Sequence, residues 1–203
     1  MIKRSKYFNL TYPTFRYVHQ YLINKKVLDL GCSSGIFLNY LSNGSVGVDI
    51  DINNLIECRK RGLIVVQSDL NFAFPFINNS VEAVLCSHIL EHVRAPIDFL
   101  KELRRILNKR AVVIIGLPIE GGIAGPRFKY FRGHPGHLYS FSPQNLIRLL
   151  ELNNIKAKKI FFHLAKVGYK RNLFWLNDIF QFLPSSILYK LSSSYYCVAE
   201  KLD

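Results

Sequence analysis

Short apolar runs alternate with amphipathic segments along the first part of the chain. The strand-like runs are 26–30, 45–49, 64–67, 81–86 and 111–116. The segments with helical character are 14–23, 36–41, 53–61 and 95–107. Strands that alternate with helices at this spacing form a parallel sheet with helices on both faces. The pattern therefore predicts a doubly wound, Rossmann-like α/β fold.

One of these helices, at 95–107, shows the amphipathic pattern most clearly. Its expected apolar face consists of Ile97, Leu100, Leu103 and Leu107. Charged residues occupy the opposite face, as in a helix that packs one side against a sheet.

The C-terminal part adds one helix start and two strand-like runs. Ser142 before Pro143 is a good helix start, with serine as the cap and proline at the first helical position, and the helix should reach about Asn153. The strand-like runs are 155–162 and 195–201. About 30 residues separate them, far more than a hairpin needs. We therefore expect a single domain over 1–203 with a helical insertion at about 164–193.

The insertion contains apolar residues at helical spacing. They are Leu173, Leu176, Phe180 and Leu183, and a second short helix is expected after Pro184 through Ile187, Leu188 and Leu191. The basic stretch 166–171 stands just before the first of them. Basic residues beside an aromatic amphipathic helix suit a membrane surface or a lipid-linked acceptor, although a lid or packing helix gives the same pattern.

Composition limits the class of protein. Hydrophobic residues make up 49% of the 203 residues, which suits a folded globular core. The four cysteines show no C-x-x-C spacing, which predicts reduced thiols. No apolar stretch of about 18 residues and no signal-peptide core occurs, so no spanning helix is expected. These features favour a cytoplasmic protein.

The positive charge is concentrated in one part of the chain. The formal net charge is +13, and the segment 121–172 holds ten Lys or Arg residues against one acid, Glu151. Such a field favours an anionic partner, which could be nucleic acid, an acidic substrate or an anionic membrane in peripheral contact, although a generally Lys/Arg-rich composition gives the same charge. Nucleic acid is a weaker expectation, because no RNA-reading motif such as an aromatic platform strand is present.

The most informative stretch is 27–35, where a buried strand leads into a glycine-rich turn. Small residues let the backbone approach a ligand, and a helix that begins there would offer unpaired N–H groups. The turn is not G-x-G-x-x-G and lacks G-K-[ST], so dinucleotide and P-loop sites are both weakened. In open parallel sheets, ligands bind beyond the carboxyl ends of strands, which is where this turn lies.

The same turn also matches G-x-S-x-G, the nucleophile elbow of α/β-hydrolases, with Ser33 as the nucleophile. That enzyme class builds its oxyanion hole from a loop after an earlier strand. Only about 25 residues precede this strand, and none resembles the strand–loop pair that such an elbow requires. A hydrolase remains an alternative, and Ser33→Ala would abolish its ester cleavage.

Acidic residues follow the second and third predicted strands. Asp49 and Asp51 end or follow the second, and Asp69 follows the third. A carboxylate at the second position can accept both hydroxyls of a ribose, and Asp49 is favoured over Asp51 for this role. Asp69 could reach an adenine amino group or simply cap a turn. Three ligand groups at three successive strand ends indicate a nucleotide-like ligand.

With these motifs in this order, residues 26–160 resemble the class I S-adenosylmethionine-dependent methyltransferases, particularly the small type 11 group. The resemblance implies a seven-stranded sheet whose last strand is antiparallel and pairs with the sixth. It also implies S-adenosylmethionine as cofactor. The residues implied to bind it are Asp29, Gly31, Cys32, Ser33, Gly35, Asp49, Ile50, Asp69, Leu70, Ser87 and His88.

Within that set, the resemblance implies separate roles. The 29–35 loop shapes the pocket for the methionine part, Asp49 holds the ribose, and Ile50 lies against adenine. Ser87 and His88 line the pocket near the sulfonium.

The histidines carry two further hypotheses. His88-x-x-Glu91-His92 matches a zinc-peptidase pattern, but Pro96 limits any helix there, and the resemblance places a loop. We therefore expect no metal, with Glu91 and His92 organising that loop and His88 facing the pocket.

The second hypothesis concerns the segment 133–142, which in the related family covers the acceptor site. His137 could deprotonate or orient an acceptor, or His134 and His137 could only hydrogen-bond the loop. His137 and His88 are the candidate catalytic residues.

The sequence thus predicts a methyltransferase acting on a small-molecule or lipid-linked acceptor. A non-catalytic methyltransferase-like binding module is the alternative outside enzymology. The intact 29–35 loop and Asp49 count against it, because a module without cofactor has no use for them.

Overall fold

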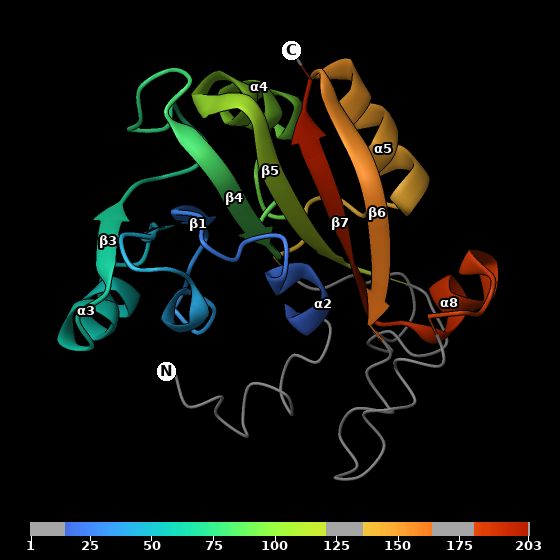
Figure 1. Cartoon of the computed structure of the whole chain (residues 1–203), viewed down its shortest axis with the longest axis horizontal. Coiled ribbons are helices and arrows are strands. Elements are labelled where there is room, and N and C mark those ends of the chain that lie inside the picture. The colour runs from blue at the N-terminus through green and yellow to red at the C-terminus, as the bar shows by residue number, and fades with distance from the viewer. Residues whose placement is uncertain (1–14, 121–135, 164–180, 203) are drawn as a thin grey trace, which may run out of the picture.

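The computed structural model describes residues 15–120, 136–163 and 181–202. Its centre is a seven-stranded sheet with the order β3-β2-β1-β4-β5-β7-β6 (Figure 1). The strands are β1 (Val27–Leu30), β2 (Val46–Asp49), β3 (Ile64–Gln67), β4 (Val81–Ser87), β5 (Leu107–Pro118), β6 (Ile155–His163) and β7 (Ser194–Lys201). The first five pair in parallel, and β7 lies antiparallel between β5 and β6. The predicted sheet, including its antiparallel last strand, is confirmed.

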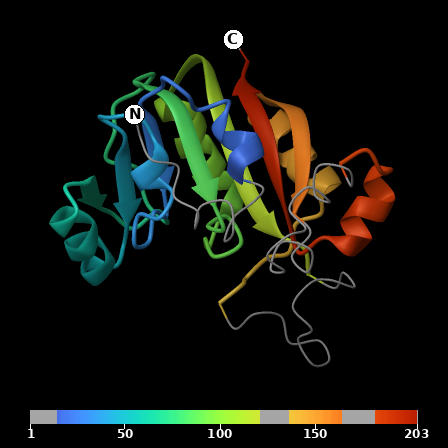
Figure 2. The same cartoon turned by 60° about the horizontal axis from the view of Figure 1, so that its bottom comes forward.

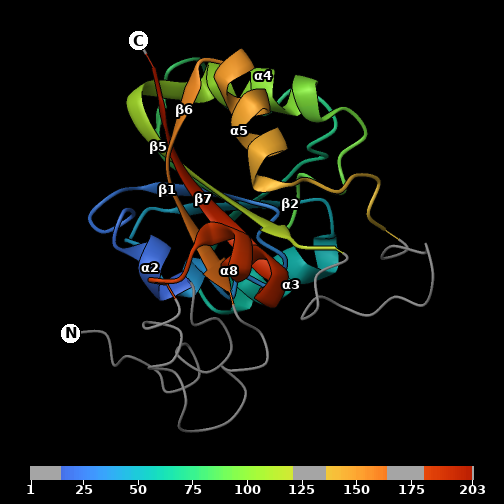
Figure 3. The same ribbon diagram turned by 90° about the vertical axis from the view of Figure 1, so that its right-hand side faces the viewer.

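Helices cover both faces of this sheet. They are α2 (Phe15–His19), the 3₁₀ helix η1 (Leu38–Tyr40), α3 (Ile52–Lys60), α4 (Pro96–Ile106), α5 (Pro143–Leu152) and α8 (Ser185–Leu191). Figure 3 shows α4 and α5 on one face and α2 and α3 on the other. Two hydrophobic clusters match this division, one containing the buried residues of α4 and α5 and the other those of α2 and α3.

The apolar face of α4 differs from the prediction. Ile97 is 52% exposed, and Leu107 is not in the helix but begins β5. The buried side chains of the helix after Pro96 are Phe99, Leu100, Leu103 and Ile106. These four follow the 3.6-residue period, whereas the predicted stripe began one step off it at Ile97.

The glycine loop is followed by turns and η1 instead of the predicted helix over 36–41. Ser33 (φ +46°) and Gly35 (φ +69°) adopt left-handed backbone, which cannot continue a right-handed helix. The amide of Asn39 donates to the carbonyl of Gly35 at 3.0 Å, which stabilises the tight turn. The loop therefore does not present a helix N-terminus to a ligand. The prediction of a helix over 36–41 with unpaired N–H groups at its start was wrong.

The predicted start of α5 is confirmed, because the Ser142 hydroxyl accepts a hydrogen bond from the N–H of Asn145 at 3.2 Å. The short helix expected after Pro184 is α8, whose Leu188 is buried against the cluster that contains α4 and α5. The helix expected through 173–180 lies outside the described residues.

Two composition-based expectations have structural counterparts. All four cysteines are buried free thiols. Among the described residues, no helix is both long enough and apolar enough to cross a membrane.

Candidate active site

A pocket of about 150 Å³ opens beyond the carboxyl ends of the parallel strands. Figure 2 brings the side of the sheet at which β4 and β5 end toward the viewer. Its lining residues are Gly31, Asp49, Ile50, Ser68, Asp69, Leu70, Asn71, Ile89, His92 and Val93. Five of them come from the predicted cofactor set: Gly31, Asp49, Ile50, Asp69 and Leu70. The other six members lie outside this lining: Asp29, Cys32, Ser33, Gly35, Ser87 and His88.

Asp49 joins the end of β2 to the glycine loop. Its Oδ2 accepts the backbone N–H of Ser33 at 2.7 Å, and its Oδ1 accepts that of Asp51 at 2.9 Å. Asp51 has a different task, since its side chain caps α3 by accepting the N–H of Asn53 at 2.8 Å. The structure thus separates the two candidate acids: Asp49 lines the pocket, and Asp51 does not.

Asp29 is buried inside β1, with only 1% of its surface exposed. Its Oδ2 has no hydrogen-bond partner among the described residues. Burial, and secondarily the charge of Asp49, raise the pKa of Asp29 to about 7. An unpartnered buried acceptor is costly in the free protein, and a ligand with hydrogen-bond donors or positive charge would satisfy it.

The glycine loop is shaped by close packing as well as by backbone conformation. Gly31 has φ +74°, and a Cβ built there would lie 2.9 Å from Cδ1 of Ile89. A side chain at this position would therefore both strain the backbone and displace Ile89 from the pocket wall.

Asp69 and Ile50 also line the pocket. The Oδ1 of Asp69 accepts both the backbone N–H and the side-chain amide of Asn71, at 2.9 and 2.8 Å. Asp69 therefore caps a turn and also lines the pocket, and its contact with an adenine amino group stays a prediction. Ile50 is 60% exposed and offers an apolar surface beside this acid.

The end of β4 leads into a loop and not into a zinc-binding helix. His88 has φ +57°, and residues 88–92 form a bend and turns. The ring of His88 lies edge-on to Tyr196, with the ring centroids 6.5 Å apart. The Ser87 and Tyr196 hydroxyls are 3.0 Å apart. The H-x-x-E-H pattern therefore does not place its two histidines on one helix.

A second group of polar side chains lies between the ends of β4 and β5. Nδ1 of His137 is 2.5 Å from Oε1 of Glu120, which follows β5. The rings of His137 and His92 meet edge to face, with centroids 4.8 Å apart. Glu91 is fully buried beside them, and its carbonyl accepts the N–H of Leu138 at 2.8 Å. Sequence reasoning missed Glu120, and it gave His92 only a role in the loop.

Three of these residues carry a side-chain atom that could coordinate a metal ion. One such atom each of Glu91, His92 and His137 lies within 4.8 Å of the others. His134, the other histidine of the predicted acceptor segment, lies outside the described residues.

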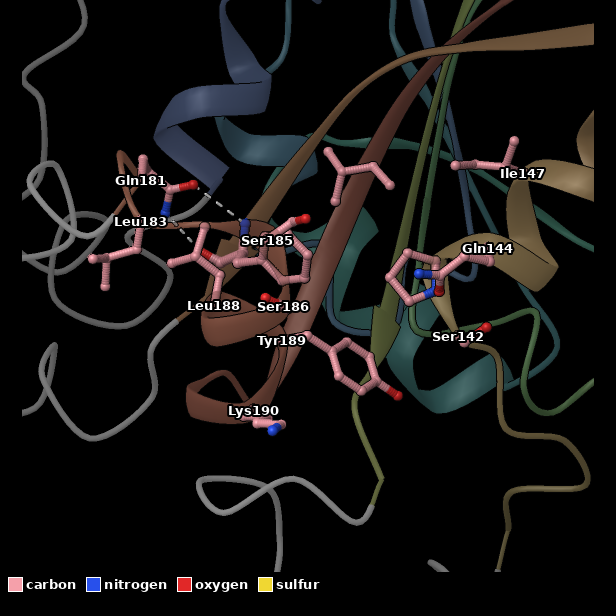
Figure 4. Close-up of a pocket in the computed structure, with 13 residues that line it drawn as sticks. Ser142, Gln144, Ile147, Gln181, Leu183, Ser185, Ser186, Leu188, Tyr189 and Lys190 are labelled. Carbon is pink, nitrogen blue, oxygen red and sulfur yellow. Dashed lines mark hydrogen bonds between the residues drawn. The ribbon is translucent and has the colours of Figure 1, made fainter.

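A larger pocket of about 620 Å³ lies among α5, β6 and α8 (Figure 4). Its apolar side chains are Pro143, Ile147, Ile160, Phe162, Leu183, Leu188 and Tyr189. Its polar side chains are Ser142, Gln144, Gln181, Ser185, Ser186 and Lys190. The amide of Gln181 donates to the carbonyl of Phe162 at 2.8 Å and fixes one wall. Because β6 and β5 are both antiparallel to β7, they run in the same direction. This pocket at the carboxyl end of β6 therefore opens on the same side of the molecule as the smaller pocket, beyond the carboxyl ends of the parallel strands.

The strand order of the sheet and the pocket at the strand ends are typical of the class I methyltransferase fold. Residues 28–115 match the methyltransferase domain family. An uncharacterized protein of Methanocaldococcus jannaschii is 28% identical over 185 residues, a match that covers 89% of this chain and 73% of that protein.

Two further proteins that are similar to this chain have names that state an activity. The ubiquinone biosynthesis O-methyltransferase of Histophilus somni is 26% identical over 105 residues, which cover 45% of this chain and 44% of that protein. The structure of a possible histamine N-methyltransferase from Thermotoga maritima superposes with a TM-score of 0.73 at 17% identity, covering 97% of this chain and 93% of that one.

Residues 28–115 thus hold a methyltransferase domain, and the sheet has the class I fold of the S-adenosylmethionine-dependent methyltransferases. The hydrolase alternative at Ser33 lacks its machinery: among the described residues before β1, no strand is present to supply an oxyanion loop.

Proposed function

We propose that the protein transfers the methyl group of S-adenosylmethionine to an apolar small molecule or lipid-linked acceptor. The observation that carries this proposal is the presence of two pockets beyond the carboxyl ends of strands in the same sheet. The smaller pocket lies at the ends of β1 and β2, and the larger one lies at the end of β6. The loops after β4 and β5, which hold His88 and Glu120, come between them in the strand order.

The residues of the smaller site fit the cofactor. Asp49 accepts the ribose hydroxyls, Ile50 lies against adenine, and Asp69 accepts from the adenine amino group. The pocket of about 150 Å³ is smaller than whole-ligand pockets of roughly 300 Å³ or more, so the methionine part extends along the 29–35 loop. There the unpartnered Oδ2 of Asp29 suits a positively charged ligand.

The other residues of the cofactor set complete this site. Cys32, Ser33 and Gly35 form the loop beside the methionine part. Leu70 closes the adenine end, and Ser87 and His88 stand at the sulfonium end.

The bound cofactor supplies a methyl group on a positively charged sulfonium, which leaves as a neutral thioether. Transfer would form a bond from the acceptor lone pair to the methyl carbon as the carbon–sulfur bond breaks. Positioning in line supplies most of the rate, and the chain's own contribution is to hold the acceptor and remove its proton. Glu120 can accept from Nδ1–H of His137, and in the neutral tautomer that makes this bond the lone pair on Nε2 takes the proton. His88 orients the acceptor.

The larger pocket determines the kind of acceptor. Its wall is mainly aliphatic and aromatic, with hydroxyl, amide and one ammonium group around it. Such a lining binds an apolar body and fixes its polar end by a few hydrogen bonds.

A charge inserted into this pocket tests the proposal. Ile147 lines it, whereas Leu152 on the same helix is 80% exposed and does not. Radiolabelled methyl transfer should be measured to prenyl, quinone and fatty-acyl acceptors, with polar metabolites and RNA as comparison. Ile147→Glu should abolish transfer to the apolar acceptors while cofactor affinity is retained, and Leu152→Glu should behave as wild type. Transfer only to polar acceptors, unaffected by Ile147→Glu, would contradict the proposal.

Peripheral contact with an anionic membrane follows from the +9 charge of 121–172, and it would bring a lipid-linked acceptor to the enzyme. Sedimentation with phosphatidylserine vesicles should carry the protein down at low salt. Equal sedimentation with neutral vesicles, or none at all, would refute this contact.

A further inference from the structure

A cluster of acidic and imidazole side chains lies beside the cofactor pocket. From its geometry we infer that the protein binds a divalent first-row transition-metal ion such as Zn²⁺ through Glu91, His92 and His137. One potential ligand atom of each residue lies within 4.8 Å of the others. This site differs from the H-x-x-E-H pattern, which pairs His88 with His92, and it revises the expectation that no metal binds.

The carboxylate of Glu91 gives the first argument. Its side chain is fully buried, and neither oxygen accepts a hydrogen bond from any residue that the structure describes. One ring nitrogen of His88, Nδ1, lies 3.3 Å from Oε1. Burying an ionised carboxylate without donors is costly unless a cation neutralises it. A bound metal ion would supply that charge.

The orientation of the two imidazoles gives the second argument. Nδ1 of His92 lies 2.7 Å from the carbonyl of Gly136, and Nδ1 of His137 lies 2.5 Å from the carboxylate of Glu120. A carbonyl can only accept, so Nδ1 of His92 carries its proton. Metal-binding histidines characteristically donate one ring N–H to a carbonyl or carboxylate and coordinate through the other nitrogen. Both rings follow this arrangement, with Nε2 as the coordinating atom.

The backbone holds the three residues in place. The N–H groups of Leu138 and Tyr139 donate to the carbonyl of Glu91 at 2.8 and 3.3 Å, and the Tyr139 hydroxyl donates to the carbonyl of Arg94 at 2.8 Å. These bonds tie the segment with His137 to the turn with Glu91. Ligand atoms around a tetrahedral Zn²⁺ lie about 3.4 Å apart for bonds of about 2.1 Å. The ligand atoms, now within 4.8 Å of one another, would have to move closer together when the ion binds.

The donor set indicates the class of metal. Two imidazoles and one carboxylate suit Zn²⁺ or Fe²⁺ and leave coordination positions open, whereas Mg²⁺ prefers oxygen ligands. His92 also lines the cofactor pocket, so the ion would lie near the site of transfer. A hydroxyl bound to such an ion would lose its proton more readily, and His137, with Nε2 on the ion, would then act as a ligand instead of taking that proton itself. This role rests on the proposed function, but the binding of the ion does not.

Calorimetric titration of Zn²⁺ into metal-free full-length protein tests the inference. We expect one ion per chain in the wild type and at least about tenfold weaker binding in Glu91→Gln and in His137→Gln. The matched control is Glu57→Gln, which removes an exposed glutamate paired with Lys60 and should bind as wild type. At about 100-fold excess over the wild-type Kd, Zn²⁺ should raise the wild-type Tm by about 5 °C and that of Glu91→Gln by no more than about half as much.

Cobalt identifies the ligands, because buried thiols at Cys32 and Cys58 could also bind a metal. Co²⁺ should show ligand-field bands without a thiolate-to-metal charge-transfer band. Absence of binding by folded wild type, a thiolate band, or full binding by the folded His137→Gln variant would overturn the inference. A separate titration of S-adenosylmethionine into metal-free protein keeps the two proposals apart, since either can fail alone.

Discussion

Replacement of Asp29 by asparagine should stabilise the free protein while weakening the cofactor site. Asp29 is buried, one carboxylate oxygen has no partner among the described residues, and its pKa is raised from 3.8 to about 7. A shift of about three pKa units corresponds to about 4 kcal/mol of stability lost when the group ionises. An asparagine keeps the shape and removes the charge, but its buried amide costs about 1–3 kcal/mol. The net gain at pH 8 should be about 2 kcal/mol.

The pH dependence of this gain has a definite sign. Between about pH 4 and pH 7 the folded protein keeps a proton on Asp29 that the unfolded chain has released. The free energy of unfolding therefore falls as pH rises through this window and levels off above it. Asp29→Asn lacks this contribution, so its advantage should grow from pH 5 to pH 8.

Urea unfolding of both proteins at pH 5, 6, 7 and 8 measures the difference, and cofactor affinity should be measured on the same samples. We expect Asp29→Asn to be more stable at pH 8 yet to bind S-adenosylmethionine more weakly, because the ligand loses its anionic partner. A variant that is less stable at pH 8, or a difference that does not change with pH, would refute the reasoning.

Two further predictions concern the fold. Arg105 bonds to the carbonyls and the asparagine of the 74–78 loop, so Arg105→Ala should cost about 2 kcal/mol in urea unfolding, whereas Lys101→Ala, which breaks only an exposed pair, should cost under about 0.5 kcal/mol. An equal effect of both would contradict this account of the loop. A Cβ at Gly116 would collide with the ring of Tyr196, so Gly116→Ala should lower stability by about 2 kcal/mol or more, and Tyr196→Leu should restore part of it. The absence of any rescue in the double variant would show that another contact is responsible.

Hydrophobic spacing predicted the strands well, because buried β-branched runs bounded by turns carry a strong local signal. It failed over 36–41, where the apolar residues have helical spacing but the left-handed conformations of Ser33 and Gly35 precede them. The conformation of a non-glycine residue such as Ser33 depends on its hydrogen bond to Asp49, which joins segments 16 residues apart. Local spacing carries no information about that bond.

In the candidate site, too, some residues could be placed from local sequence and others depend on contacts between distant segments. Asp49 and Asp69 follow strands and could be placed at the pocket from sequence. The pairing of Glu120 with His137 depends instead on the paths of two loops, and the larger pocket depends on how α8 meets β6. These contacts join distant segments, and the motifs around them contain no signal for them.

The strand-end cofactor site is tested most directly by calorimetric titration of S-adenosylmethionine into purified protein. Asp49→Ala and Asp51→Ala form a matched pair, since the two acids lie two residues apart and only Asp49 faces the pocket. We predict one-site binding in the micromolar range, weakened about 10- to 100-fold by Asp49→Ala and nearly unchanged by Asp51→Ala, which loses only a helix cap. No binding by well-folded wild type, or equal losses in the two variants, would contradict the account.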